Sequence, residues 1–170
     1  VFKQGGIHNY ENIIAKVGKN EHVLSASPFL QGECLLKHSE RVYGVSVMGV
    51  CSSDKKVRAN ICKNLKYGTF DLGEKVRLEN KKKKSIWGIV LGKELAFKLG
   101  AVPSARIQCI SAAVSKKSGS LSPSLIECEV AGIFESGMYD VDSAMAYICL
   151  EASRKLFHKK PNAAGGKEIK

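Results

Sequence analysis

The stretch "VAGIFESGMYDVDSAMAYICLEASRKLF", Val130 to Phe157, decides the fold that this sequence predicts. With the residues before it, "LIECEVAGIF" (125–134) alternates along its length, which is typical of a β-strand. A second apolar run, "AMAYICL" (144–150), has strand length. The segment "LEASRKLF" predicts a short helix, because basic residues and Pro161 follow it. The stretch therefore predicts a strand, a loop, a second strand and a helix in succession.

The loop inside this stretch carries three carboxylates, Glu135, Asp140 and Asp142, beside Gly137 and Tyr139. Such a group suits a metal site, a general-acid pair, or a tight loop held by its polar side chains. A calcium-binding EF-hand loop needs a third ligand and a Gly where this sequence has Ser and Ala. Two aspartates on one face of a strand suit a like-charge acid pair, but the sequence names no pocket partner for them. The residues alone do not decide among these three alternatives, although they favour a structural loop.

Working outward from this loop, helical and strand-like segments are mixed. The segment "KELAFKLG" predicts a helix over 93–99 with Gly100 at its C-cap. Strands are predicted at 22–30, 33–38, 41–50, 85–92 and 105–114, a helix at 10–17, helical spacing at 57, 61 and 65, and turn chemistry at 115–124. Strand pairs beside strand–helix neighbours indicate an α+β architecture.

The composition limits the function classes. A chain of 170 residues suits one domain, or one domain with a smaller insert. Its 27 basic and 16 acidic residues give a net charge of +11, which indicates nucleic acid, anionic lipid or an acidic protein as partner. The densest basic run, Lys81 to Lys84, lacks the interleaved aromatic residues of a nucleic-acid stacking platform. A solvated loop is favoured there, and a basic nucleic-acid-binding module stays as the alternative function.

No motif for a cofactor, a metal or catalysis is present. The six cysteines have no zinc-like spacing, and most stand in apolar runs where Cys acts as a small hydrophobic residue. The P-loop, dinucleotide-binding, zinc-protease and serine-hydrolase motifs are absent from the sequence. No apolar run reaches the roughly 18 residues that cross a bilayer. We therefore predict no catalytic residue, no metal ligand and no cofactor.

Four stretches, read together, resemble one family. They are "NYENIIAKV…VLSASPFLQGECLL", "VYGVSVMGV", "GIVLGKELAFKLG" and the opening stretch, and they cover about Ile7 to Phe157. In this order and spacing they resemble the periplasmic domain of lipoprotein-releasing ABC transporter permeases of the LolC/LolE type. The last two segments are the most specific.

The resemblance implies a MacB-like periplasmic core. Residues 1–48 and 126–170 would form a porter-like subdomain of strand–helix–strand units, and residues 49–125 a smaller, mostly β inserted subdomain. The acidic loop would then connect two porter strands, with Gly137 turning the chain. The side chains of Asp140 and Asp142 would hold the loop by local hydrogen bonds, and Tyr139 belongs to the same loop.

The resemblance also implies a function. Such permeases are inner-membrane proteins that take lipoproteins from the membrane and pass them to a periplasmic carrier. A separate cytoplasmic subunit hydrolyses ATP, so no enzymatic activity is expected in this periplasmic domain. The implied partners are the carrier, the lipoprotein cargo, the ATPase subunit and a second permease copy, with no nucleic acid.

In this family a protruding hairpin grips the carrier, and residues 111–124, "SAAVSKKSGSLSPS", match it. Its lysines offer charge, and its Val and Leu offer apolar anchors. Directly after it, Leu125 and Ile126 stand where some members carry Arg or Gln. The carrier-binding residues predicted in this way are Val114, Ser115, Lys116, Lys117, Ser118, Gly119, Leu121 and Pro123.

Overall fold

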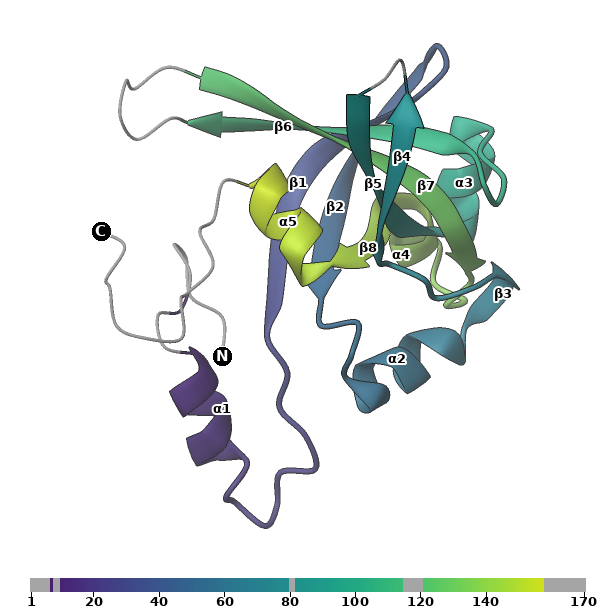
Figure 1. Ribbon diagram of the computed structural model, residues 1–170. Helices are drawn as coiled ribbons and strands as arrows, with labels where there is room; N and C mark the ends of the chain where they lie inside the picture. Colours follow the sequence, from purple (N-terminus) through teal and green to yellow (C-terminus); the bar gives the residue numbers. More distant parts are fainter. Residues whose placement is uncertain (1–6, 8–9, 80–81, 115–120, 158–170) are drawn as a thin grey trace.

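The computed structural model describes residues 7, 10–79, 82–114 and 121–157, and these residues form an α+β fold (Figure 1). The predicted fold class is thereby confirmed. In chain order the described elements are α1 (Tyr10–Val17), β1 (Phe29–His38), β2 (Arg41–Val50), α2 (Lys55–Cys62), β3 (Leu65–Gly68), β4 (Glu74–Glu79), β5 (Lys82–Gly92), α3 (Lys93–Leu99), β6 (Arg106–Val114), β7 (Leu121–Phe134), α4 (Tyr139–Ala144), β8 (Met145–Cys149) and α5 (Leu150–Leu156).

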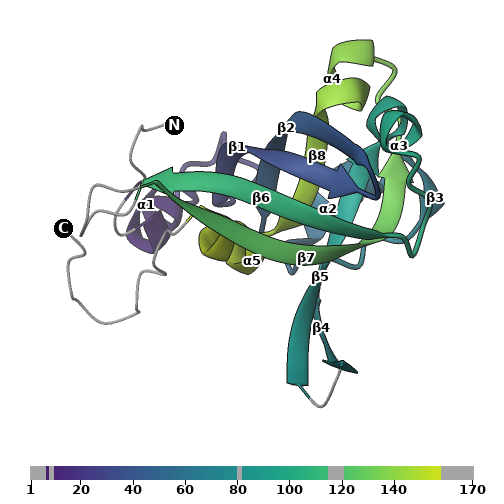
Figure 2. The same ribbon diagram turned by 90° about the horizontal axis from the view of Figure 1, so that it is seen from above.

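The strands form one sheet in the order β3-β7-β6-β1-β2-β8-β5-β4, with a further pairing between β7 and β5. This further pairing closes a ring, because β5 bonds to β8 along one side and to β7 along the other. The ring consists of β1, β2, β8, β5, β7 and β6. Two of its contacts are parallel, β2 with β8 and β5 with β7. Seen from above, β6 and β7 cross one side of this ring and α5 lies next to them (Figure 2).

The hydrophobic core is built from the ring strands and the helices beside them. In β2 the buried residues Val45 and Val47 alternate with more exposed ones, as the sequence pattern predicts. In β5 every residue from Ile86 to Leu91 except Gly88 is a buried large apolar residue. A strand with neighbours along both edges and covered faces requires such a continuous apolar run.

The predicted helix at 93–99 is α3, and the structure confirms its C-cap. Leu95, Ala96 and Leu99 are its buried residues. Gly100 follows in the left-handed conformation at φ 65°, and its amide donates to α3 carbonyls. The helix therefore ends where the glycine stands in the sequence.

The last helix, α5, packs closely against β2 (Figure 1). A Cβ added at Gly49 would lie 2.0 Å from Ser153 Oγ, so only glycine permits this approach. Ser153 is fully buried, and its hydroxyl donates to the Leu150 carbonyl oxygen at 2.8 Å. The helix thereby fixes the C-terminal part of the described chain to the ring.

Three local predictions are wrong. The strand expected at 22–30 begins only at Phe29, because the segment before it bonds to α2 instead of a strand. The Lys56 ammonium donates to the Leu24 carbonyl oxygen, and the Ser27 hydroxyl donates to the Asp54 carboxylate. The helical spacing does not reach residue 65, since α2 ends at Cys62 and β3 follows. The predicted turn at 115–124 is too long, because β7 begins at residue 121 and pairs with β6.

The division into a porter-like unit (1–48 and 126–170) and an inserted unit (49–125) stays a prediction. Strands of both ranges belong to the same sheet, since β5 pairs with β8.

Candidate functional site

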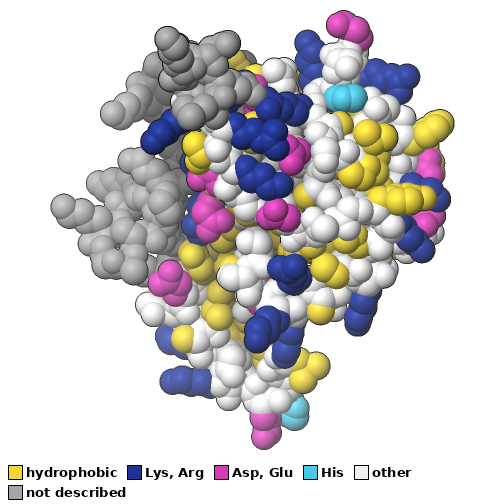
Figure 3. All heavy atoms as spheres, turned by 45° about the vertical axis from the view of Figure 1, so that its right-hand side comes forward, with side chains coloured by type: hydrophobic (Ala, Val, Ile, Leu, Met, Phe, Trp, Pro, Cys, Tyr) yellow, Lys and Arg dark blue, Asp and Glu magenta, His cyan; other side chains and the backbone are white. Residues whose placement is uncertain are grey.

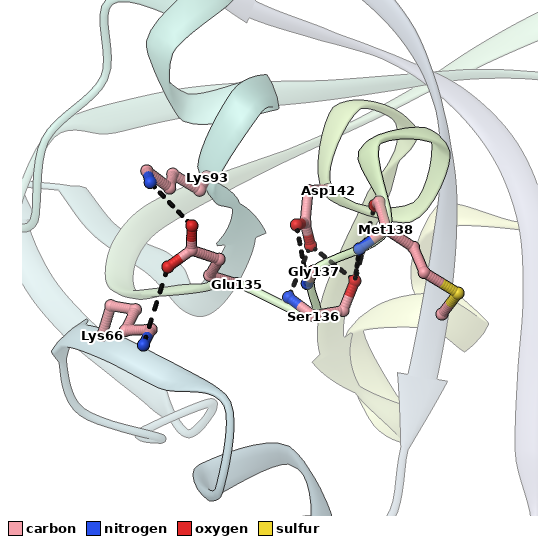
Figure 4. Close-up of polar contacts among 7 residues, drawn as sticks. All are labelled: Lys66, Lys93, Glu135, Ser136, Gly137, Met138 and Asp142. Atoms are coloured by element: carbon pink, nitrogen blue, oxygen red, sulfur yellow. Dashed lines mark hydrogen bonds and ion pairs between the residues drawn. The ribbon is translucent and has the colours of Figure 1, made fainter.

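The acidic loop between β7 and β8 is organised around Asp142 (Figure 4). Its carboxylate accepts hydrogen bonds from the Ser136 amide at 2.8 Å, the Ser136 hydroxyl at 2.8 Å and the Gly137 amide at 3.3 Å. The Asp142 amide in turn donates to the Met138 carbonyl oxygen at 2.9 Å. Asp142 is only 4% exposed, and Gly137 has a φ of 84°, which favours glycine. Both oxygens of this carboxylate are engaged in hydrogen bonds within the loop, so its role here is to hold the loop conformation.

Glu135 links the end of β7 to two other elements. Its carboxylate lies 2.7 Å from the Lys93 ammonium of α3 and 3.6 Å from the Lys66 ammonium of β3 (Figure 4). Its amide donates to the Asn64 carbonyl oxygen at 2.8 Å. The hydrogen bond from Lys93 holds the pKa of Glu135 below its usual value and raises the pKa of Lys93. Sequence reasoning missed both lysines, because they come from distant elements.

The two aspartates of the loop have different surroundings. Asp142 is buried, whereas Asp140 lies exposed on the short helix α4. The Asp140 carbonyl oxygen accepts from the Ser143 hydroxyl at 3.4 Å. Tyr139 is 61% exposed, and the Lys98 ammonium lies 5.1 Å from the centroid of its ring. Within the described residues, no group of three or more His, Cys, Asp or Glu side chains could hold a metal ion.

The second candidate site is the β6–β7 hairpin, whose outer part extends past the stretch of β6 that pairs with β1. β6 pairs with β1 only through residues 108–110, while its pairing with β7 continues to Val114 opposite Leu121. Pro123 is exposed. Residues Ser115, Lys116, Lys117, Ser118 and Gly119, together with the side chains of Val114 and Leu121, lie outside the described part of the chain.

The base of this hairpin is held against α5. Ser111 and Ser124 are opposite each other in the ladder, and both are buried. The Ser124 hydroxyl donates to the Lys155 carbonyl oxygen at 3.1 Å. Next along β7, Leu125 is 53% exposed while Ile126 is 8% exposed. Where some members of the resembled family carry Arg or Gln, this chain therefore presents one exposed apolar side chain.

Many basic side chains outside the hairpin are paired with carboxylates. Glu129 accepts from Arg77 at 2.8 Å and from Lys75 at 3.3 Å, and Lys84 pairs with Glu127. In these ion pairs the carboxylates offset the positive charge of the basic side chains beside them on the sheet. This surface does not favour the alternative of a nucleic-acid-binding module.

The cysteines mostly occupy the core, as their apolar neighbours predict. Cys109 and Cys128, on neighbouring strands, are fully buried with their sulfur atoms 3.5 Å apart. Their contact and burial raise the pKa of Cys109. Sequence spacing gave no signal of this contact, which follows from the β6–β7 register.

No described helix is both long and apolar enough to cross a membrane.

No protein-family model matches the chain. Curated sequences are similar to about nine tenths of it. The "Lipoprotein-releasing system transmembrane protein LolC" of Neisseria meningitidis is 24% identical over 160 residues, which is 92% of this chain and 36% of that protein. The protein of the same name from Xylella fastidiosa is 26% identical over 151 residues, which is 88% of this chain and 34% of that protein.

Solved structures are similar to this fold. The extracellular domain of the noncanonic ABC-type transporter YknZ from Gram-positive bacteria superposes with a TM-score of 0.50 at 14% identity, covering 85% of this chain and 64% of that domain. The periplasmic region of MacB from Actinobacillus actinomycetemcomitans gives a TM-score of 0.42 at 12% identity, covering 94% of this chain and 60% of that region. The chain spans about a third of the length of its curated relatives. The predicted resemblance is confirmed: the chain is similar to LolC-type transmembrane proteins over about nine tenths of its length, and it has the fold of an extracytoplasmic ABC-transporter domain.

Proposed function

We propose that this chain is the periplasmic domain of an ABC transporter permease of the inner membrane. The permease would release lipoproteins from that membrane and hand them to a periplasmic carrier. The observation that carries the proposal is the similarity to LolC proteins across 92% and 88% of the chain. In this proposal the domain itself catalyses no reaction. A separate cytoplasmic subunit hydrolyses ATP, and a second permease copy completes the membrane assembly.

The β6–β7 hairpin is the part of the domain that we propose contacts the carrier. Support comes from its extension past the stretch paired with β1, where residues 111–114 and 121–124 pair with each other. Support also comes from its anchored base, where Ser124 bonds to α5. A hairpin that is held at its base and whose outer ladder pairs with no third strand in the described part of the chain can enter a groove on a partner without a large ordering cost. The exposed Pro123 lies on this outer part.

The acidic loop has a positioning role in this proposal. Asp142 braces the turn after β7, and Glu135 ties the end of the same strand to α3 and β3. Because β7 runs from the hairpin to this loop, the two sites lie at opposite ends of one strand. The loop thereby fixes the strand from which the hairpin projects.

The proposal is tested by cross-linking the domain to the lipoprotein carrier of the same organism. In one variant, residues 115–121 are replaced by a short Gly-Ser turn. In a matched control, the connection at 80–81 between β4 and β5 is replaced in the same way. Circular dichroism checks that both variants keep the fold. We expect cross-links to the carrier in the parent and the control, and their loss in the hairpin variant.

Unchanged cross-linking in the hairpin variant would show that the carrier binds elsewhere on the domain. No cross-linking of the folded parent chain would overturn the carrier function altogether.

A further inference from the structure

A surface hollow lies at the C-terminal end of α3, far from the β6–β7 hairpin. Its volume is about 770 Å³, and Tyr43, Phe97 and Val102 are among the residues that line it. These residues come from β2, α3 and the segment after α3. In Figures 1 and 2, α3 and the outer end of the hairpin lie at opposite ends of the molecule. The hollow is therefore distinct from the proposed carrier contact.

Large apolar side chains are exposed around this hollow. Phe97 is 81% exposed, Val102 64% and Tyr43 38%. Phe97 points away from the core because the other apolar residues of α3 are the buried ones. Met138 and Tyr139, at the start of the neighbouring helix α4, are each 61% exposed. Figure 3 looks onto this side and shows hydrophobic side chains gathered in its upper right part, with Lys and Arg side chains above them and side chains of both charges at the right-hand edge. Exposed apolar side chains gathered with aromatic residues are typical of a protein-binding site.

Two cations line the same hollow, Arg41 and Lys98. The Arg41 guanidinium donates to the Lys98 carbonyl oxygen at 3.1 Å, which holds it over the end of α3. The Lys98 ammonium rests against the Tyr139 ring. None of the described residues that line the hollow is acidic. The hollow thus combines an apolar floor with cations held in place before any partner binds.

We propose that this hollow binds an acidic segment of a partner protein. An apolar side chain of the segment would pack on Tyr43, Phe97 and Val102, and neighbouring carboxylates would pair with Arg41 and Lys98. Charge complementarity favours this occupant over a second copy of the chain. A two-fold contact between copies would bring the same cations of both copies together, which is unfavourable. The inference goes beyond carrier binding and uses none of the hairpin residues.

The test uses the 170-residue chain and two short synthetic peptides. In the first peptide Asp alternates with Leu and Phe, and in the second Lys replaces every Asp. Binding is followed by NMR through the backbone amide signals. We expect the acidic peptide to shift the signals of residues 41–43 and 96–102, and the lysine peptide to leave them unchanged. Loss of one aromatic anchor or one cation should weaken binding about tenfold.

Matched variants separate binding at the hollow from binding that depends only on the net positive charge of the chain. Phe97→Ser removes an apolar group of the hollow, and Leu24→Ser removes one that is 86% exposed elsewhere. Lys98→Glu reverses a charge at the hollow, and Lys83→Glu reverses one on β5. The proposal requires weaker binding in the first variant of each pair and unchanged binding in the second.

Equal weakening by Lys83→Glu and Lys98→Glu would overturn the proposal, because it would reflect net charge alone. Binding of the lysine peptide or no binding of either peptide would also overturn it. So would a dimer in sedimentation that Phe97→Ser dissolves, since the occupant would then be a second copy. The hairpin variant with the Gly-Ser turn should bind the acidic peptide normally, so failure of carrier binding and failure of this site are distinguishable.

Discussion

The Ser124 hydroxyl donates a 3.1 Å hydrogen bond to the Lys155 carbonyl oxygen, and this contact joins the base of the β6–β7 hairpin to α5. The donor, Ser124, is a buried residue of the hairpin, and the acceptor, Lys155, lies in the last turn of α5. A helix terminus has carbonyl oxygens without partners inside the helix. The hairpin therefore supplies a further donor to a carbonyl oxygen at the end of α5.

Ser124→Ala should lower the free energy of unfolding by about 0.5–1.5 kcal/mol, because it removes this one hydrogen bond. Urea denaturation of the parent and variant measures the difference. Ser143→Ala is the matched control, since the Ser143 hydroxyl makes a longer 3.4 Å bond. A control effect as large as that of Ser124→Ala would contradict the role assigned to the buried contact.

Asp142→Ala should destabilise the fold by about 1.5–3 kcal/mol, because a carboxylate that accepts from Ser136 and Gly137 is lost. Asp140→Ala, at an exposed position of the same loop, should change stability by less than about 0.5 kcal/mol. Thermal unfolding monitored by circular dichroism compares the two variants. Similar losses in both would show that Asp142 is not the residue that holds the loop.

The Glu135 carboxyl should titrate below the usual glutamate pKa of about 4.3. Its pKa is lowered in the fold, so its contribution to stability is present above the unfolded pKa. That contribution is lost as the pH falls through the lower folded pKa. NMR titration of the Glu135 carboxyl carbon measures the value. Lys93→Met should raise it more than Lys66→Met does, since the hydrogen bond from Lys93 is the main cause.

If Lys66→Met produced the larger rise, the 2.7 Å contact with Lys93 would not be the dominant one in solution. Glu135→Gln should make the loss of stability in acid shallower, because the residue that takes up the proton is gone.

Reduced protein should react with a thiol reagent at pH 8 first through Cys51 and Cys62, which are half-buried. Cys149 should react only on unfolding, because its burial raises the pKa of its thiol to about 11. Mass spectrometry after brief labelling identifies the modified positions. Fast labelling of Cys149 in the folded chain would contradict its buried placement.

Local features of the fold were readable from the sequence. The helix α3 and its Gly100 cap follow from apolar spacing and a single glycine. The strands β1 and β2 follow from the apolar runs at 33–38 and 41–50, which predict two strands close together in the chain. These features depend on neighbours in the chain, which is why pattern reasoning finds them.

Features that depend on distant residues were not readable. The ring closes only because β5 pairs with β7, and the sequence of neither strand indicates which strand it pairs with. The lysines around Glu135 and the hollow beside Phe97 likewise arise from segments far apart in the sequence. The sequence did contain one indication of the hollow. Phe97 lies outside the apolar face of α3, and an exposed aromatic residue in that position indicates a surface contact.

The closed ring has a mechanical consequence for whatever binds the hairpin. Each ring strand is bonded along both edges, so moving one strand alone would break ladders on two sides. We therefore expect a pull on β6 and β7 to be passed on to β5 and β8 through the ladders between them. We expect the domain to respond to such a pull as one stiff body.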